Sequence, residues 1–262
     1  MNEKTKVVLK IEDISLSFGA LQALADVSMD LKEKEILAII GPNGAGKTSL
    51  LNCISGFYRP QKGKIYFDGQ DVSRMPPYKR AAIGIGRTFQ NVEIYAGLTA
   101  LDNLMIGRHP IMENGLVSGA LWFGRGRRIE IEHRKQVEKI IDLLELESIR
   151  DNPGAFLTYG QRKKVDLGRA LAMKPKMLIL DEPMAGMNLD EKEDIARYVL
   201  DFHQLWEMPI ILVEHDMSVV MDIADRVVVI DFGIKIAEGT PAEIKSNQKV
   251  INAYLGAAMK KD

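Results

Sequence analysis

Cysteine is nearly absent from this chain of 262 residues, which contains a single thiol at Cys53. A lone cysteine cannot form an intramolecular disulfide, which excludes a disulfide-stapled fold and favours a reducing compartment. Long apolar runs are missing as well. The longest, such as residues 36–40 and 227–230, hold five and four residues, whereas a membrane-spanning helix needs about 20. Residues 1–10 contain no signal-peptide core. We therefore expect any work at a membrane to take place at its surface, through other subunits.

An excess of charge of either sign is also missing, because 35 Lys and Arg residues stand against 36 Asp and Glu residues and the formal net charge is −1. This balance argues against nucleic acid as the main partner. A hydrophobic fraction of 46% with 27% charged residues is ordinary for a globular protein and excludes wholesale disorder. The length suffices for one large domain with a sizeable core.

Short, uninterrupted apolar runs are typical of strands covered on both faces, as in a parallel sheet flanked by helices. Four such runs occur, at residues 36–40, 177–180, 210–213 and 227–230. Helical periodicity lies between them: apolar residues recur at i, i+3, i+4 and i+7 over 137–144, and a second apolar face covers 195–206. The fold class predicted is therefore α/β.

The first seventy residues show a different pattern. Residues 14–18 and 27–31 alternate apolar and polar side chains, and residues 64–67 end at the turn dipeptide Asp68-Gly69. These signals predict an N-terminal antiparallel β region. Strand signals become sparse between residues 91 and 175, which predicts an inserted helical subdomain. The expected single domain, 1–262, comprises an α/β core (1–90 and 176–240), the helical subdomain (91–175, with an insertion at 108–128) and a C-terminal helix and tail (241–262).

A complete phosphate-binding motif follows the apolar run at 36–40. It matches G-x-x-x-x-G-K-[ST] and reads Gly41-Pro42-Asn43-Gly44-Ala45-Gly46-Lys47-Thr48. Glycines allow backbone N–H groups to converge on phosphate oxygens, and the helix expected at 49–54 adds its positive end. Lys47 supplies a charge for the β- and γ-phosphates, and the Thr48 hydroxyl can ligate Mg²⁺. The sequence therefore predicts a P-loop nucleotide site.

Carboxylates follow two of the predicted buried strands. The run at 177–180 ends in Asp181 and Glu182, and the run at 210–213 is followed by Glu214, His215 and Asp216. Ligands of such sheets bind beyond the carboxyl ends of the strands. Asp181 is then placed to hold Mg²⁺ through its water shell, Glu182 to orient and deprotonate an attacking water, and His215 to contact the γ-phosphate. Asp216 is expected to cap the helix that follows.

These elements, in this order, resemble the nucleotide-binding subunit of ATP-binding-cassette (ABC) transporters. The deciding segment is Leu157-Thr158-Tyr159-Gly160-Gln161, which resembles that family's signature and precedes a helical run at 162–173. Gln90 is similar to the family's glutamine loop, and Phe18 to the aromatic residue that stacks on adenine. The resemblance covers about residues 8–240.

The resemblance implies a pair of such subunits arranged head to tail, with each ATP held between one phosphate loop and the partner's signature segment. It implies ATP hydrolysis with Mg²⁺. The expected catalytic residues are Glu182, His215, Gln90 and Lys47. The expected nucleotide contacts are Phe18, residues 41–48, Ser49, Thr158, Gly160 and Gln161. The expected metal ligands are Thr48, Gln90 and Asp181, with Gln90 at the junction to the helical subdomain.

Departures from the common family pattern indicate one branch. Tyr159 replaces a signature glycine, and Asn188 stands where many members have aspartate. Both are usual in ATPases of branched-chain amino-acid uptake systems, as is a longer connection at 108–128. This branch implies two transmembrane permease subunits, a second and unlike ATPase subunit, and an indirect link to an extracytoplasmic solute-binding protein, with this chain peripheral at the cytoplasmic face of the membrane.

Several alternatives stay open at this stage. The transported solute could instead be urea or a short amide, and an export ATPase would share the same motifs. A soluble ABC protein acting on ribosomes or DNA usually has two cassettes or coiled-coil arms, neither of which this sequence shows. A P-loop kinase would have no use for the signature segment or His215. The insertion carries Trp122 and Phe123 beside arginines and either docks a membrane partner or packs onto the neighbouring helices.

Overall fold

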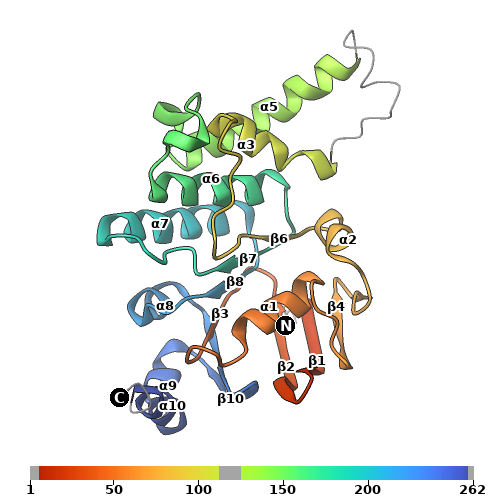
Figure 1. The fold of residues 1–262 in the computed structure, drawn as a ribbon, viewed down its shortest axis with the longest axis vertical. Helices are drawn as coiled ribbons and strands as arrows, with labels where there is room; N and C mark the ends of the chain where they lie inside the picture. Colours follow the sequence, from red (N-terminus) through yellow and green to blue (C-terminus); the bar gives the residue numbers. More distant parts are fainter. Residues whose placement is uncertain (1–5, 112–124, 259–262) are drawn as a thin grey trace, which may run out of the picture.

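The computed structural model describes residues 6–111 and 125–258. Two sheets form the lower part of the molecule in Figure 1, and a layer of helices lies above them. Within the described ranges no helix is long and apolar enough to cross a membrane.

The N-terminal sheet is antiparallel, as predicted. Its strands are β1 (Val7–Phe18), β2 (Leu21–Lys32), β4 (Lys62–Phe67) and β5 (Gln70–Asp71), in the order β2-β1-β4-β5. Buried residues on β1 and β2, such as Ile11 and Val27, face the second sheet and leave polar neighbours outside. The turn at Asp68-Gly69 joins β4 to β5.

The second sheet has six strands in the order β10-β9-β3-β8-β7-β6. They are β3 (Ile36–Ile40), β6 (Ile85–Arg87), β7 (Met177–Asp181), β8 (Ile210–Val213), β9 (Arg226–Asp231) and β10 (Ile234–Gly239). All neighbours are parallel except β10, which pairs antiparallel with β9. Every residue of β3, β7 and β8 is buried, which explains their uninterrupted apolar runs.

Helices cover both faces of this sheet. Helix α1 (Lys47–Ser55) lies between the two sheets with α2 (Pro77–Ala82) beside it, while α8 (Met217–Ile223), α9 (Pro241–Lys245) and α10 (Gln248–Ala258) cover the other face near β9. Successive residues of β3 alternate between these cores: Leu37 and Ile39 join α1, and Ala38 and Ile40 join α8 and α9. The α/β class is therefore confirmed.

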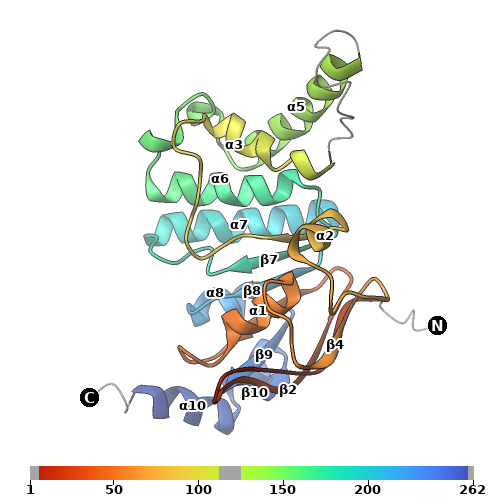
Figure 2. The same cartoon turned by 45° about the vertical axis from the view of Figure 1, so that its right-hand side comes forward.

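The upper layer consists of helices and 3₁₀ turns. It contains α3 (Ala100–Ile106), η1 (His109–Ile111), α5 (Arg125–Leu143), η2 (Glu147–Ile149), η3 (Gly154–Phe156) and α6 (Tyr159–Ala172), and α7 (Leu189–Trp206) joins it to the sheet. Figures 1 and 2 both show α6 and α7 side by side between α3 and β7. One continuous apolar core links α3, α5, α6 and α7 to β7 and β8. The part of the predicted insertion at residues 112–124, with Trp122 and Phe123, lies outside the described residues.

Candidate active site

The phosphate-binding motif forms the loop between β3 and α1 in a conformation that requires glycine. Gly46 precedes α1 with a left-handed φ of 106°, and a Cβ there would lie 2.6 Å from the Ala23 carbonyl oxygen. Gly41 has a φ of 152°, and its Cβ would lie 2.0 Å from the Ile230 carbonyl oxygen. The loop is thus held between β2 and β9 at a spacing that a side chain would break. Its backbone N–H groups precede the N-terminus of α1, the arrangement that binds phosphate.

Lys47 begins α1, and its ammonium is buried. It donates hydrogen bonds to the carbonyl oxygens of Gly41 at 2.7 Å and Pro42 at 3.0 Å. Burial lowers the pKa of Lys47, while the charges of Glu182 and Asp181 act in the opposite direction. The loop therefore fixes one cation opposite two carboxylates.

A cavity of about 620 Å³ lies over the phosphate loop. It is lined by Phe18, residues 21–23, residues 43–49, Gln90, Glu182, His215 and residues 232–233. Phe18 is 46% exposed at the rim and contacts Tyr58 edge to face, with ring centroids 5.1 Å apart. The structure therefore brings together the predicted aromatic residue, the phosphate loop and all four predicted catalytic residues, Lys47, Gln90, Glu182 and His215.

Glu182 lies at the centre of the polar groups. One carboxylate oxygen contacts His215 Nε2, and the other accepts a hydrogen bond from Gln90 Nε2 at 2.8 Å. Its backbone is left-handed, with a φ of 51°, which is uncommon for a residue other than glycine and is often found at functional sites. The carboxylate is mostly buried but lines the cavity. This arrangement fixes a carboxylate where a water beside the phosphates could be oriented and deprotonated.

Glu214 supports this arrangement from behind. It is buried, and its carboxylate accepts hydrogen bonds from the backbone N–H groups of Met184 at 2.8 Å and His215 at 3.0 Å. Burial raises the pKa of Glu214, while these two hydrogen bonds lower it. Glu214 thereby links the loop after β7, which carries Glu182, to the loop after β8, which carries His215. Beyond it, the Asp216 side chain accepts from Ser218 N–H and caps α8, which confirms the predicted cap.

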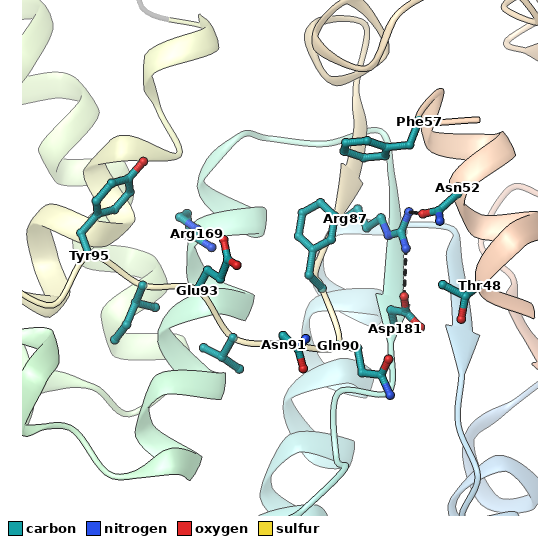
Figure 3. Close-up of a pocket in the computed structure, with 13 residues that line it drawn as sticks. Thr48, Asn52, Phe57, Arg87, Gln90, Asn91, Glu93, Tyr95, Arg169 and Asp181 are labelled. Atoms are coloured by element: carbon teal, nitrogen blue, oxygen red, sulfur yellow. Dashed lines mark hydrogen bonds and ion pairs between the residues drawn. The ribbon is translucent and has the colours of Figure 1, made fainter. Parts of the chain in front are cut away.

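Asp181 ends β7 beside Thr48, and its side chain is 3% exposed. One carboxylate oxygen accepts a hydrogen bond from Arg87 Nη2 at 2.9 Å. Figure 3 shows Asp181 between Arg87 and Thr48, with Gln90 below. Hydroxyl, carboxylate and amide oxygens are donors that suit Mg²⁺. These few oxygen donors fit an ion that keeps water and phosphate ligands. Among the described residues no group of three His, Cys, Asp or Glu side chains could hold a metal ion.

Two cations of the site were not predicted from the sequence. Arg87 pairs with Asp181, and Lys163 of α6 donates to the backbone oxygens of Glu182 at 3.0 Å and Gln90 at 3.2 Å. Each had a local signal that could have been used. Arg87 lies two residues after apolar Ile85 and three before Gln90, and Lys163 falls on the apolar face of its helix.

The signature segment lies apart from this cavity, at the start of α6. Thr158 caps the helix in a reciprocal capping box with Gln161. Gly160 is buried against α7, where a Cβ would lie 2.3 Å from Glu191 Oε1. The Tyr159 ring lies against Gly186, and a Cβ added to Gly186 would lie 3.3 Å from Tyr159 Cε1. Within one chain these residues do not reach the phosphate loop, so their contact with nucleotide stays a prediction.

Two models of known protein families match this chain. Residues 24–185 match the model of the ABC transporter family. The chain belongs to this family of ATPases. Residues 235–259 also match the model described as branched-chain amino acid ATP-binding cassette transporter. The predicted family and ATP-hydrolysing activity are therefore confirmed.

Individual relatives cover nearly the whole chain. It is 35% identical over 254 residues to the high-affinity branched-chain amino acid transport ATP-binding protein BraF of Pseudomonas aeruginosa, covering 97% of this chain and 100% of BraF. It is 35% identical over 251 residues to LivG of Escherichia coli K12, covering 96% and 98%. The ADP conformation of the ATP-binding cassette MJ1267 superposes with a TM-score of 0.83 at 34% identity, covering 96% of this chain and 100% of that one.

Proposed function

We propose that the chain is the ATP-hydrolysing subunit of an importer for branched-chain amino acids, peripheral at the cytoplasmic face of a membrane. The observation that carries the solute class is the match of residues 235–259, from β10 through α10, to the branched-chain amino acid cassette model. Full-length similarity to BraF and LivG, whose names describe high-affinity branched-chain amino acid transport, supports the same class.

The site supports a definite division of roles. Phe18 at the rim is placed to stack on adenine, and residues 41–49 to hold the phosphates with the Lys47 ammonium among them. Thr48 and Asp181, with Gln90, would hold Mg²⁺, which would supply positive charge against the phosphate oxygens.

Hydrolysis is assigned to Glu182. Its carboxylate takes a proton from water as the water oxygen bonds to the γ-phosphorus. The bond between that phosphorus and the bridging oxygen breaks, ADP leaves with the electron pair, and inorganic phosphate is formed. His215 and Gln90 contact its two oxygens and hold it in place. Thr158, Gly160 and Gln161 are proposed to reach the ATP of a second ATPase subunit, so that binding closes the pair and hydrolysis reopens it.

The permease partner is proposed to dock in a groove of about 950 Å³ beside Gln90. Figure 3 shows the groove running from Asp181 and Thr48 to Tyr95, past Arg87, Glu93 and Arg169. Its exposed aromatic rings and paired charges suit a short amphipathic helix at the end of a membrane subunit. Because the segment 90–95 both lines the groove and carries Gln90, docking there would act on the group that holds Glu182.

The experiment combines capture and transport. The Glu182→Gln variant, trapped with ATP, is used to capture its stoichiometric companions from detergent-solubilised native membranes. Two polytopic proteins and a second, unlike ATPase are expected. The captured complex, rebuilt with wild-type subunits and its solute-binding protein in vesicles, is then expected to accumulate leucine in the presence of ATP and to ignore urea.

Other results would contradict the proposal at different levels. Uptake of urea or short amides would retain the importer and overturn the solute class. Transport of the solute away from the side of the membrane that holds the ATPase subunits and ATP would identify an exporter. Ribosomal or DNA-bound companions would leave the ATPase assignment intact and remove transport.

A further inference from the structure

Arg87 occupies a position between the metal carboxylate and the permease groove. It ends β6, and its side chain is 6% exposed. Nη1 donates to Asn52 Oδ1 at 2.8 Å and to Ser55 Oγ at 3.1 Å, and Nη2 donates to Asp181 Oδ2 at 2.9 Å. The guanidinium therefore joins β6, α1 and β7 at one point.

The two bonds from Nη1 fix the guanidinium on α1. Asn52 and Ser55 lie one and two turns after Lys47 and Thr48, which begin the same helix. The position of the Arg87 guanidinium is thereby fixed relative to the phosphate loop. Because the guanidinium is a planar fork, fixing one nitrogen also fixes the direction of the other toward Asp181.

Arg87 holds the Asp181 carboxylate by one of its two oxygens. Arg87 pairs with Oδ2, and Figure 3 places Thr48 on the other side of the carboxylate. A carboxylate held by one oxygen presents the second in a fixed direction, which favours binding to a hydrated cation. Thr48 and Asp181 both line the groove, so the Thr48 hydroxyl and the second carboxylate oxygen are available to one ion there.

Two aromatic rings cover the opposite side of Arg87. The guanidinium carbon lies 5.0 Å from the ring centroid of Phe89 and 6.0 Å from that of Phe57, and the two rings meet edge to face. Both rings are exposed and line the groove. They keep water from the cation and strengthen its hold on Asp181.

We propose that Arg87 is a positioning residue for the metal, which holds Asp181 so that its second oxygen is directed to Mg²⁺ beside Thr48. This inference rests on the proposed assignment of Asp181 and Thr48 to the metal. Two effects of removing Arg87 oppose each other. The charge of a freed Asp181 is less neutralised and attracts the ion more strongly, yet without Arg87 the carboxylate is free to rotate and its second oxygen is no longer held in one direction. We expect the loss of this fixed direction to be the larger effect, so loss of Arg87 weakens Mg²⁺ binding.

The test measures binding rather than turnover. In the Glu182→Gln background, ATP binding is followed by calorimetry while free Mg²⁺ is varied, and the Mg²⁺ concentration at half-maximal effect is recorded. Arg87→Met is expected to raise this concentration by about tenfold or more, because loss of a group that orients a metal ligand typically costs about 10- to 100-fold in metal affinity. Arg87→Lys keeps the charge but not the planar guanidinium, so its Mg²⁺ concentration at half-maximal effect is expected to fall between those of the parent and Arg87→Met. ATP affinity in EDTA is expected to stay within about threefold of the parent.

Arg150→Met is the matched control. Arg150 makes an arginine–carboxylate ion pair with Glu138 at 2.7 Å in the helical layer, so its loss is expected to affect stability alone. Asp181→Asn tests the underlying assignment: if it leaves the Mg²⁺ dependence unchanged, the metal assignment itself is wrong. If Asp181→Asn shifts the dependence and Arg87→Met leaves it unchanged or tightens it, the role of Arg87 is overturned.

Asn52→Ala covers the case in which Arg87→Met does not fold. It removes one anchor while leaving the ion pair, so a shift in the same direction of about threefold is expected, below the tenfold or more seen when an orienting group is lost outright. An unchanged midpoint for both Asn52→Ala and Arg87→Lys would overturn the proposal.

Discussion

The ammonium of Lys163, on α6, donates to the backbone oxygen of Glu182 at 3.0 Å. It also donates to the backbone oxygen of Gln90 at 3.2 Å, and its burial lowers the pKa of Lys163. One helical turn later, buried Asp166 accepts a hydrogen bond from the backbone of Phe89. Helix α6 therefore holds the segments that carry Glu182 and Gln90, and the signature segment lies at its own N-terminus.

Lys163→Met is expected to lower the ATP turnover rate about tenfold, because one positioned hydrogen bond from a charged donor contributes about 1.5–3 kcal/mol and part of this is retained by Asp166. ATP affinity should change little, since Lys163 does not line the nucleotide cavity. Single-turnover kinetics and calorimetry measure the two quantities. Lys164→Met is the control, because Lys164 pairs with Asp194 and Tyr198 instead. Equal losses in both variants would remove the specific role of Lys163.

Glu182→Gln is expected to lower hydrolysis by about 10²–10⁴, the usual contribution of a general base. The amide keeps the size of the side chain and can still contact His215 and Gln90, so ATP binding should persist. Phosphate release and nucleotide retention report the two effects. Turnover close to that of the wild type would assign the base to another group.

Lys47→Ala is expected to weaken ATP binding about ten- to hundredfold, as removal of a charged hydrogen-bond donor costs about 1.5–3 kcal/mol. Equilibrium binding in EDTA isolates this effect from the metal. Lys62→Ala on the exposed end of β4 is the control, with unchanged affinity expected. Tight binding by Lys47→Ala would contradict the phosphate-loop assignment.

Asp216→Ala is expected to lower the free energy of unfolding by about 1 kcal/mol near neutral pH, the usual effect of losing an N-cap. Hydrogen bonds from Lys192 and Ser218 lower the pKa of Asp216 to about 2. A depressed pKa adds stability above the ordinary range near pH 4, and this stability is lost as the pH falls toward 2.

Denaturant midpoints of wild type and Asp216→Ala should therefore differ most above pH 4 and converge at lower pH. Asp222→Ala, on the exposed side of the same helix, serves as the control. If the difference between the two midpoints instead grew as the pH fell, the stabilisation of ionised Asp216 by Lys192 and Ser218 would be refuted.

The parts of the fold that the sequence predicts correctly are those with local causes. Uninterrupted apolar runs marked β3 and β8, and the glycines of the phosphate loop marked its turn. The run at 177–180 continues by one residue to Asp181, and α1 begins at Lys47 rather than at Ser49. Strand β6 was not predicted, because three residues are too few to show a period. Strand β10 was not predicted either, because it is an edge strand whose side chains are only partly buried and form no uninterrupted apolar run.

The site shows the same division between local and distant causes. Motif residues such as Glu182 and His215 follow strands, so their meeting at one sheet edge could be predicted. Arg87 and Lys163 depend on partners 94 and 19 residues away along the chain. Such pairs are set by the packing of three elements and leave no periodic mark in the sequence. The placement of Thr158 away from the cavity agrees with the head-to-tail pair that the resemblance implies and leaves that pair to be tested.

The lone thiol of Cys53 has a practical consequence. It is fully buried in α1, and burial raises the pKa of Cys53 to about 12. A thiolate is the form that reacts with maleimides, so this cysteine stays inert under ordinary labelling conditions. A cysteine introduced at an exposed position, such as Phe156 beside the signature segment, would be the single point of dye attachment in the natural background. With a second dye on the partner ATPase subunit, fluorescence distances would then test the proposed opening and closing of the pair without removal of the native Cys53.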